Sequence, residues 1–172
     1  MAPSRQDTRP TPTMIRSICD LSDDHRDKVR TARGVFRDFG QRPKFHGPIT
    51  TIHCFEDNAL LKSTLGEPGN GRVMVVDGGG SLERALFGDV LGGLLLGNGW
   101  AGVVINGAVR DVENLRQMPI AVRALGICPT QPRKLGSGER DVVVSFAGIT
   151  FCPGHWLYAD ENGIIVSEQP LE

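Results

Sequence analysis

An α/β fold with a mixed sheet and a strand-rich C-terminal third is the architecture that the sequence predicts. Two β-branched runs, residues 73–76 and 103–105, each end in glycine-containing turns and enclose an apolar segment broad enough to form a helix. This is the pattern of a strand–helix–strand unit. After residue 142, short apolar runs alternate with turns that contain glycine or aspartate, which is typical of antiparallel hairpins. Together the two patterns predict a mixed or two-sheet α/β domain.

Length and composition favour one globular domain without an affinity for nucleic acid or membranes. The chain has 172 residues, of which 40% are hydrophobic and 23% charged, and its formal net charge is −1. We expect a polar, proline-containing tail over residues 1–13 and a single α/β domain over residues 14–172. The near-neutral charge provides no electrostatic attraction to nucleic acid or anionic lipid. No apolar run approaches the ~20 residues of a membrane span.

The cysteines and the N-terminal sequence indicate a cytoplasmic protein. Cys19, Cys54, Cys128 and Cys152 form no C-x-x-C pair, so reduced thiols are favoured over a disulfide framework. Residues 1–13 contain charges and prolines but no apolar segment of the kind found in signal peptides. Cys54 and Cys152 lie in strand-like apolar runs, so we expect them to be core thiols.

The first half of the chain predicts short helices followed by a strand and another helix. Residues 17–33 contain helix-capping residues and charges, which indicate one or two short helices. The β-branched run 48–55 predicts the first long strand. Residues 59–65 form a short helical pattern that Asp57 or Asn58 is expected to cap and Gly66 to end.

The second half predicts the strand–helix–strand unit and then the hairpins. A helical pattern runs over residues 81–86, restarts at Gly88 and Asp89, and continues through the apolar run 90–96. Residues 112–118 predict a short helix, the apolar run 120–125 follows it, and residues 129–138 predict a surface loop. The expected hairpin strands cover residues 142–146, 149–151, 156–158 and 164–167.

The glycine triplet 78–80 is the first candidate for a ligand-binding loop. It follows the strand 73–76, and ligands of open α/β sheets bind beyond the carboxyl ends of parallel strands. It is not a dinucleotide-binding fingerprint, because that spacing requires glycine where the chain has Glu83. A tight structural turn and a binding loop explain the triplet equally well.

Residues 88–91, Gly-Asp-Val-Leu, are the second candidate. If a helix begins at Asp89, the N–H groups of Val90 and Leu91 are unpaired within it, and the helix dipole attracts a carboxylate to Gly88–Leu91. The alternative is that Asp89 only caps its own helix.

Arg110 and Asp111, which follow the strand 103–105, are the third candidate. Arginine binds a carboxylate through two parallel hydrogen bonds, and aspartate binds a hard divalent cation that keeps most of its water. Together they would hold a 2-oxo acid. The alternatives are a surface ion pair and a helix cap by Asp111.

Six motifs in order give the chain a specific resemblance. They are CFEDNALL at 54–61, VVDGGGSLERAL at 75–86, GDVL at 88–91, INGAVRD at 105–111, GERDV at 138–142 and GIIVSEQPL at 163–171. On these motifs the chain, from about residue 17 to 171, resembles the family that unites 4-hydroxy-4-methyl-2-oxoglutarate aldolases with the regulators of ribonuclease activity, formerly misnamed menaquinone methyltransferases.

The resemblance implies a role for each candidate residue. The aldolase signature is an aspartate, twenty residues and then Arg-Asp, which Asp89, Arg110 and Asp111 match. It implies that the backbone of residues 88–91 and the Arg110 side chain bind the pyruvyl unit, and that Asp111 holds Mg²⁺ or Mn²⁺, largely through water. Members that only regulate ribonucleases tend to lack the acidic residue, so Asp111 favours catalysis.

The chemistry of such a lyase agrees with these residue types. Cleaving or decarboxylating a 2-oxo acid forms a pyruvate enolate, whose oxygen a divalent cation and Arg110 would stabilise. A Schiff-base lysine needs a desolvated amine, and the chain has only Lys28, Lys44, Lys62 and Lys134, all in polar or helix-surface contexts. A metal-bound water molecule, positioned by Asp89 and Asp111, would transfer the proton.

The resemblance also implies a fold, an assembly and an activity. We expect an αββα sandwich like the swivelling phosphohistidine domain, assembled as a ring-shaped homotrimer with the site near subunit boundaries. The expected activity is cleavage of 4-hydroxy-4-methyl-2-oxoglutarate or 4-carboxy-4-hydroxy-2-oxoadipate and decarboxylation of oxaloacetate. The alternative is a non-enzymatic regulator that binds a ribonuclease. Longer aldolases of the family receive an acidic residue from a neighbouring subunit through a C-terminal extension, and Glu161 and Glu168 are the candidates to substitute for it here.

Overall fold

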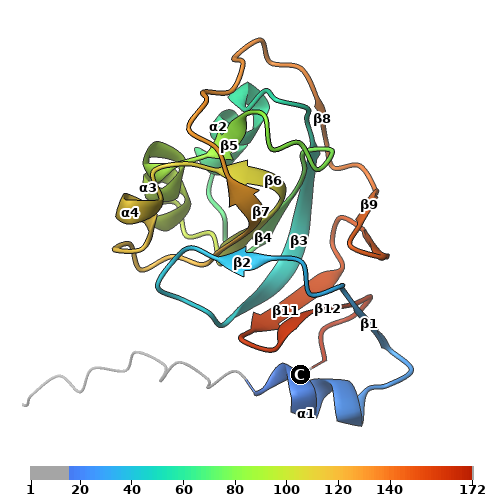
Figure 1. The fold of residues 1–172 in the computed structure, drawn as a ribbon. Helices are drawn as coiled ribbons and strands as arrows, with labels where there is room; N and C mark the ends of the chain where they lie inside the picture. Colours follow the sequence, from blue (N-terminus) through green and yellow to red (C-terminus); the bar gives the residue numbers. More distant parts are fainter. Residues whose placement is uncertain (1–15, 172) are drawn as a thin grey trace, which may run out of the picture.

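A ten-stranded mixed sheet is the framework of the protein (Figure 1). The computed structural model describes residues 16–171, so the predicted tail over residues 1–13 lies outside the described residues. The helices are α1 (Ile18–Asp24), α2 (Ala59–Leu65), α3 (Asp89–Gly97) and α4 (Val112–Leu115). The strands are β1 (Val29–Thr31), β2 (Arg37–Asp38), β3 (Phe45–His53), β4 (Val73–Asp77), β5 (Ala85–Phe87), β6 (Gly102–Val109), β7 (Val122–Ile127), β8 (Glu139–Arg140), β9 (Val144–Phe146), β10 (Ile149–Phe151), β11 (Trp156–Asp160) and β12 (Gly163–Ser167).

Strand β3 joins the two halves of this sheet. Its second half pairs in parallel with β4, from Ile49 opposite Val73 to His53 opposite Asp77. Its first half pairs antiparallel with β11, where Phe45 lies opposite Ala159. Strands β4, β6 and β7 continue the parallel half, and β12 and β1 continue the antiparallel half. The predicted mixed sheet with a strand-rich C-terminal third is therefore confirmed.

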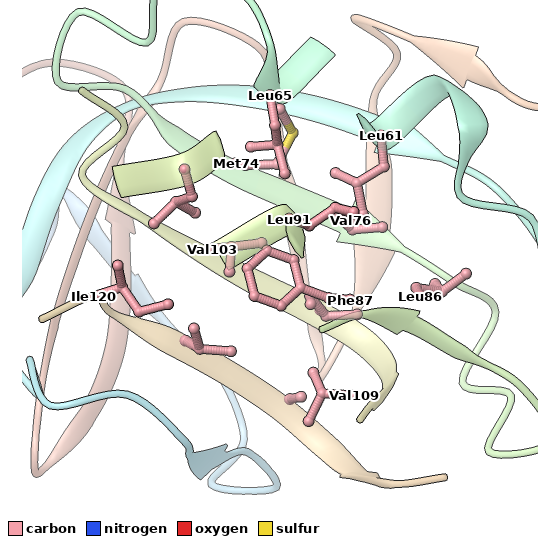
Figure 2. Packing of buried hydrophobic residues seen from close by; sticks show 14 of the residues in the cluster. Leu61, Leu65, Met74, Val76, Leu86, Phe87, Leu91, Val103, Val109 and Ile120 are labelled. Atoms are coloured by element: carbon pink, nitrogen blue, oxygen red, sulfur yellow. The ribbon is translucent and has the colours of Figure 1, made fainter. Parts of the chain in front are cut away.

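Three clusters of buried side chains define four layers. Helices α2, α3 and α4 pack on one face of β4 and β6, with Leu61, Leu91 and Leu115 against alternate strand residues such as Met74 and Val103 (Figure 2). The opposite face of the same strands packs against β11 and β12. Helix α1 covers the outer face of β11 and β12. The layers are therefore helices, the parallel half of the sheet, its antiparallel half, and helix α1. This order is that of the predicted αββα sandwich.

The helical pattern predicted over residues 81–86 is wrong. Gly79 and Gly80 adopt positive φ angles, and the chain turns there before β5 runs parallel to β6. Strand β5 has all three side chains buried. An apolar run of three residues has no period of its own, so pairing with β6 decides its structure.

Other element boundaries also differ from the prediction. One short helix predicted within residues 17–33 is confirmed as α1, but the charged segment after it contains the short strand β1. Strand β3 begins at Phe45 and ends at His53, not at residues 48 and 55. The apolar run 120–125 lies mostly in strand β7. Within residues 16–171, every helix falls short of the length and hydrophobicity that a membrane crossing requires.

The loop after β7 is anchored by a buried carboxylate. Asp57 is 1% exposed and accepts hydrogen bonds from the N–H of Leu135 at 2.8 Å and the hydroxyl of Ser137 at 3.1 Å. It also accepts the N–H of Ala59 at 3.0 Å, so it caps α2, whereas the side chain of Asn58 makes no cap bond. Burial alone would raise the pKa of Asp57, but these hydrogen bonds outweigh it and lower the pKa.

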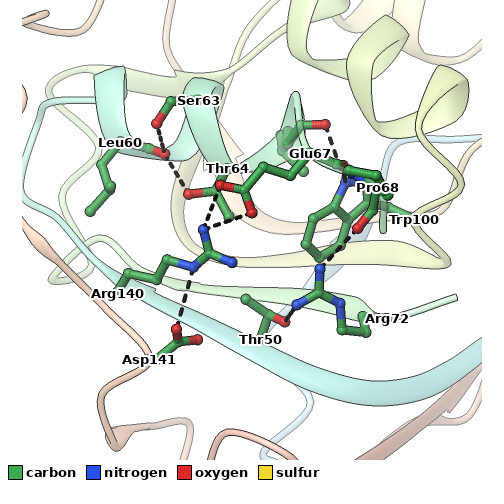
Figure 3. Close-up of polar contacts among 11 residues, drawn as sticks. Thr50, Leu60, Ser63, Thr64, Glu67, Pro68, Arg72, Trp100, Arg140 and Asp141 are labelled. Atoms are coloured by element: carbon green, nitrogen blue, oxygen red, sulfur yellow. Dashed lines mark hydrogen bonds and ion pairs between the residues drawn. The ribbon is translucent and has the colours of Figure 1, made fainter. Parts of the chain in front are cut away.

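A second set of polar contacts holds the segment between α2 and β4 in place (Figure 3). Arg140 of β8 binds both carboxylate oxygens of Glu67 at 2.8 Å. Arg72 donates to the Thr50 hydroxyl at 3.0 Å, and its guanidinium lies 4.7 Å from the centre of the Trp100 ring. These bonds hold the chain against β3 before it enters the strand–helix–strand unit.

Candidate functional site

The first turn of helix α3 begins at Asp89 and is partly exposed, with Val90 62% accessible. Gly88 is the N-cap residue and makes no side-chain cap bond, so Asp89 is the first helical residue. Val90 and Leu91 follow in the first turn, where N–H groups lack acceptors within the helix. The N-cap position belongs to Gly88 and not to Asp89, although the Asp89 carboxylate interacts with the Val90 N–H of the same first turn. The structure places residues 88–91 at a helix start, as the sequence predicted.

The sheet register brings this helix start to Arg110 and Asp111. Strand β5 pairs with β6 so that Phe87 lies opposite Val109. The N–H of Arg110 donates to the carbonyl of Phe87 at 2.9 Å. Asp89 and the Arg110–Asp111 pair, which twenty residues separate in the sequence, therefore meet at the carboxyl end of β6.

Asp111 connects three elements at this point. Its Oδ2 accepts the N–H of Asp89 at 3.2 Å, and its Oδ1 lies 3.7 Å from Nε of Arg110. Its backbone is left-handed, with φ 54° and ψ 37°, and it makes no side-chain cap bond to its own helix α4. A non-glycine residue held in this conformation costs free energy, and such residues cluster at functional sites. The predicted ion pair with Arg110 is present, whereas the helix that Asp111 caps is α3.

Gly88 fits closely under these two side chains. A Cβ atom at this position would lie 2.4 Å from Oδ2 of Asp111 and 3.1 Å from Cγ of Arg110. The absence of a side chain at Gly88 is what allows the Asp111 carboxylate to reach the Asp89 N–H.

Asn114 is a site residue that sequence reasoning missed. From helix α4, its Nδ2 donates to Oδ2 of Asp89 at 2.8 Å. This hydrogen bond is the largest influence on the pKa of Asp89 and lowers it; burial acts in the opposite direction, and the net pKa lies below its ordinary value. An exposed asparagine in a charged helix has no signature, so only the fold reveals the contact.

The donor set suits a hard, well-hydrated cation. Asp89 and Asp111 supply carboxylate oxygens, and both residues are partly exposed. Among residues 16–171, no group of three or more His, Cys, Asp or Glu residues could hold a metal ion. The Asp111 carboxylate, with that of Asp89 nearby, fits Mg²⁺, which binds proteins through one or two carboxylates and keeps several waters. Mn²⁺ accepts the same oxygen ligands.

Other predicted features lie apart from this site. Gly78 and Gly80 donate to the carbonyl of Asn106 at 3.1 Å, so the glycine triplet forms a tight turn against β6. Glu161 follows β11, next to Phe45 at the start of β3, which is the edge of the sheet opposite Arg110. Glu161 of the same subunit therefore does not complete the site.

Two cavities lie outside the constellation of Asp89, Arg110 and Asp111. One, of about 460 Å³, is lined by Lys62 and Lys134 beside Leu94 of α3. The larger, of about 760 Å³, lies between the segment after α1 and the C-terminal residues. None of the predicted site residues lines either cavity.

Comparison with known proteins shows the family. A family model described as RraA-like, aldolase/RraA, matches residues 17–166. This chain belongs to the RraA-like family.

Relatives in this RraA-like family carry an aldolase name. A protein of Alkalilimnicola ehrlichii named "Putative 4-hydroxy-4-methyl-2-oxoglutarate aldolase" is 54% identical over 152 residues, covering 88% of this chain and 94% of the relative. A protein of Xanthomonas campestris pv. campestris with the same name is 52% identical over 144 residues, covering 84% and 87%. The family membership that the six motifs predicted is therefore confirmed.

Solved structures of the RraA-like family share the fold. The RNA-processing inhibitor RraA from Thermus thermophilis has a TM-score of 0.88 at 44% identity and covers 91% of this chain and 95% of its own. A Geobacillus kaustophilus HTA426 structure named S-adenosylmethionine: 2-dimethylmenaquinone methyltransferase has a TM-score of 0.89 at 40% identity, covering 91% and 97%.

Proposed function

We propose that this protein is a divalent-metal-dependent, pyruvate-forming lyase. Its substrates are 4-hydroxy-4-methyl-2-oxoglutarate or 4-carboxy-4-hydroxy-2-oxoadipate, and it also decarboxylates oxaloacetate. The observation that carries the proposal is the contact of the Asp111 carboxylate with both the start of α3 and Arg110. This contact supports the proposal because it brings together the helix start and the two side chains to which the proposal assigns substrate binding and cation binding. The aldolase name of the relatives supports the same activity.

In this proposal the chain binds the pyruvyl half of the substrate from two sides. The Arg110 guanidinium and the first-turn N–H groups of α3 bind the carboxylate. Arg110 is part-exposed, with 30% of its side chain accessible, so it can reach a bound anion. The Asp111 carboxylate would hold the cation.

The reaction breaks the bond between C3 and C4 of the substrate. The electron pair passes to C3 and delocalises onto the 2-oxo oxygen, giving the enolate of pyruvate, while C4 leaves as a carbonyl group or as CO₂. A divalent cation supplies Lewis-acid stabilisation of that oxygen when bound. Arg110 adds positive charge beside it. Asp89, through a water molecule, accepts the C4 hydroxyl proton and later returns a proton to C3.

A Schiff-base mechanism is less well supported than this one. All four lysines of the chain, Lys28, Lys44, Lys62 and Lys134, are exposed. A nucleophilic lysine needs an amine whose pKa is lowered by desolvation or a neighbouring cation.

A ring-shaped homotrimer with the site near a subunit boundary is part of the proposal. Next to Asp89, Val90 is 62% exposed, and Ile127, opposite Val109 in the sheet, is 43% exposed. Large apolar side chains around a polar site are typical of surfaces that a partner covers.

All four cysteines are free. A cytoplasmic location stays a prediction.

A coupled assay for pyruvate tests the lyase. Protein stripped with a chelator and resupplied with Mg²⁺ or Mn²⁺ should release pyruvate from oxaloacetate and from a panel of longer 2-oxo acids. The Asp111→Asn protein under the same conditions measures the background. Release that is independent of added metal, or equal to the background, would reject the proposal.

The second candidate function is regulation of a ribonuclease. The specific observation in its favour is the 44% identity to a protein named as an RNA-processing inhibitor. Tight binding to a ribonuclease by a protein without metal-dependent pyruvate release would favour this function.

A further inference from the structure

Asn114 makes a contact that the proposed reaction does not yet use. Its side-chain amide donates to Oδ2 of Asp89 at 2.8 Å, across the gap between α4 and α3. Asn114 itself is exposed, and the buried residue of α4 is its neighbour Leu115. The asparagine side chain is therefore not needed to fill the core.

The contact closes a chain of three hydrogen-bonded groups. Asn114 binds the Asp89 carboxylate, and the Asp89 N–H binds the Asp111 carboxylate. Asp111 immediately precedes α4, and Leu115 N–H donates to the Asp111 carbonyl at 2.9 Å. The single turn of α4 therefore fixes both the carboxylate of Asp111, the proposed cation ligand, and the side-chain amide of Asn114 that holds Asp89.

The bond from Asn114 has the largest effect on the Asp89 carboxylate, which also interacts with the Val90 N–H and the Asp111 side chain. Asp89 is the first residue of α3 and is partly exposed, so core packing does not select its rotamer. A donor on α4 at 2.8 Å from Oδ2 favours the rotamer in which this oxygen faces α4. Catalytic groups held in one orientation react faster than mobile ones.

We propose that Asn114 is a positioning residue, whose side-chain amide holds the Asp89 carboxylate in the orientation that serves proton transfer. The inference rests on the proposed lyase function and adds a residue to it. A neutral donor suits this role, because it fixes the carboxylate without competing with Arg110 for the substrate anion.

Kinetics of two variants test the role. In Asn114→Ala the donor is lost, and we expect kcat for pyruvate formation to fall by at least about tenfold, with KM within twofold. Asn114→Asp keeps the size of the side chain but replaces the donor with a second carboxylate facing Asp89. It should lose at least as much activity as the alanine variant.

Binding and stability measurements separate positioning from folding. Calorimetry should give the same affinities for Mn²⁺ and for oxalate, an analogue of the enolate, in Asn114→Ala and in the wild type. The midpoint of thermal unfolding should also be unchanged. Glu113→Ala, an exposed neighbour on the same helix, is the matched control and should keep kcat within twofold.

The outcomes distinguish this inference from the proposed function. Wild-type protein without metal-dependent pyruvate release overturns the lyase proposal and the role of Asn114 with it. An active wild type whose Asn114→Ala variant keeps kcat, or changes KM and oxalate affinity instead, overturns only the positioning role. In an Asp89→Ala background, a further loss from Asn114→Ala would equally contradict it, because the two residues are inferred to act as one unit.

Discussion

Replacing Gly88 by alanine tests the geometry of the site with a single added methyl group. The new Cβ atom would lie 2.4 Å from Oδ2 of Asp111, whereas close carbon–oxygen contacts are about 3.3 Å. Gly88 has φ −148° and ψ −160°, an extended conformation that alanine also adopts. The perturbation is therefore a collision and not backbone strain.

The magnitude follows from how far the carboxylate must move. Relieving the collision shifts Oδ2 by roughly 0.9 Å, starting from a hydrogen bond of 3.2 Å to the Asp89 N–H. Losing such a cap costs about 0.5–2 kcal/mol of stability. A misplacement of about 1 Å in a catalytic group costs on the order of 100-fold in rate. We expect Gly88→Ala to fold, to be less stable by about 1 kcal/mol, and to lose most of its activity.

Pyruvate release and thermal unfolding, measured on two variants, check this expectation. Gly93→Ala on the same helix is the matched control, because Gly93 is exposed and a Cβ there meets nothing within 4 Å. Alanine at a helix interior position gains about 0.5–1 kcal/mol over glycine. The control should therefore be more stable and equally active. If Gly88→Ala kept its rate and its Mg²⁺ requirement within about threefold, the proposed arrangement of Asp111 would be refuted.

Three further substitutions or treatments have defined outcomes. Asp111→Asn keeps an oxygen for the Asp89 N–H but loses the charge, so the protein should stay folded while metal-dependent pyruvate release falls at least about 100-fold; even outer-shell partners cost about 10–100-fold. Asp57→Asn should lower the unfolding free energy by about 1–3 kcal/mol at pH 7. Because the pKa of Asp57 is lowered in the fold, its stabilisation is present above the unfolded-state pKa and lost as pH falls through the folded-state pKa, so wild type and variant should converge in acid. Burial, with the charges of Asp57 and Asp77, raises the pKa of Cys54 to about 12. A thiol reagent near pH 8 should therefore label the exposed Cys19 and leave Cys54 unlabelled until the protein unfolds. Mass spectrometry of the digested protein would show which cysteine is labelled.

The positions of the candidate residues were largely predictable because these residues lie at the ends of regular elements. Glycine followed by an apolar run marks the start of α3, and a β-branched run marks the strand before Arg110. Parallel strands joined by a helix bring such ends to one edge of a sheet. The contact between Asp89 and Asp111 follows from this topology once the strands are known.

The parts that could not be predicted depend on partners far away in the sequence. Strand β5 is three residues long and gains its structure from β6. The start of β3 includes Gly47 and Pro48, which usually argue against a strand, but here this part of β3 pairs only with β11. Asn114 became a site residue only when α4 packed beside α3. Local propensity contains no information about these pairings.

Strand β3 also determines when the protein can fold during synthesis. Its first half pairs with β11, so Phe45 can pair with Ala159 only after more than a hundred further residues have been synthesised. The inner faces of Val73, Val75 and Val104 are covered by Leu157 and Val166 of the same late segment. Pairings of such long sequence separation form slowly. We therefore expect this apolar sheet face to be accessible to chaperones until β11 and β12 have been synthesised and have packed on it.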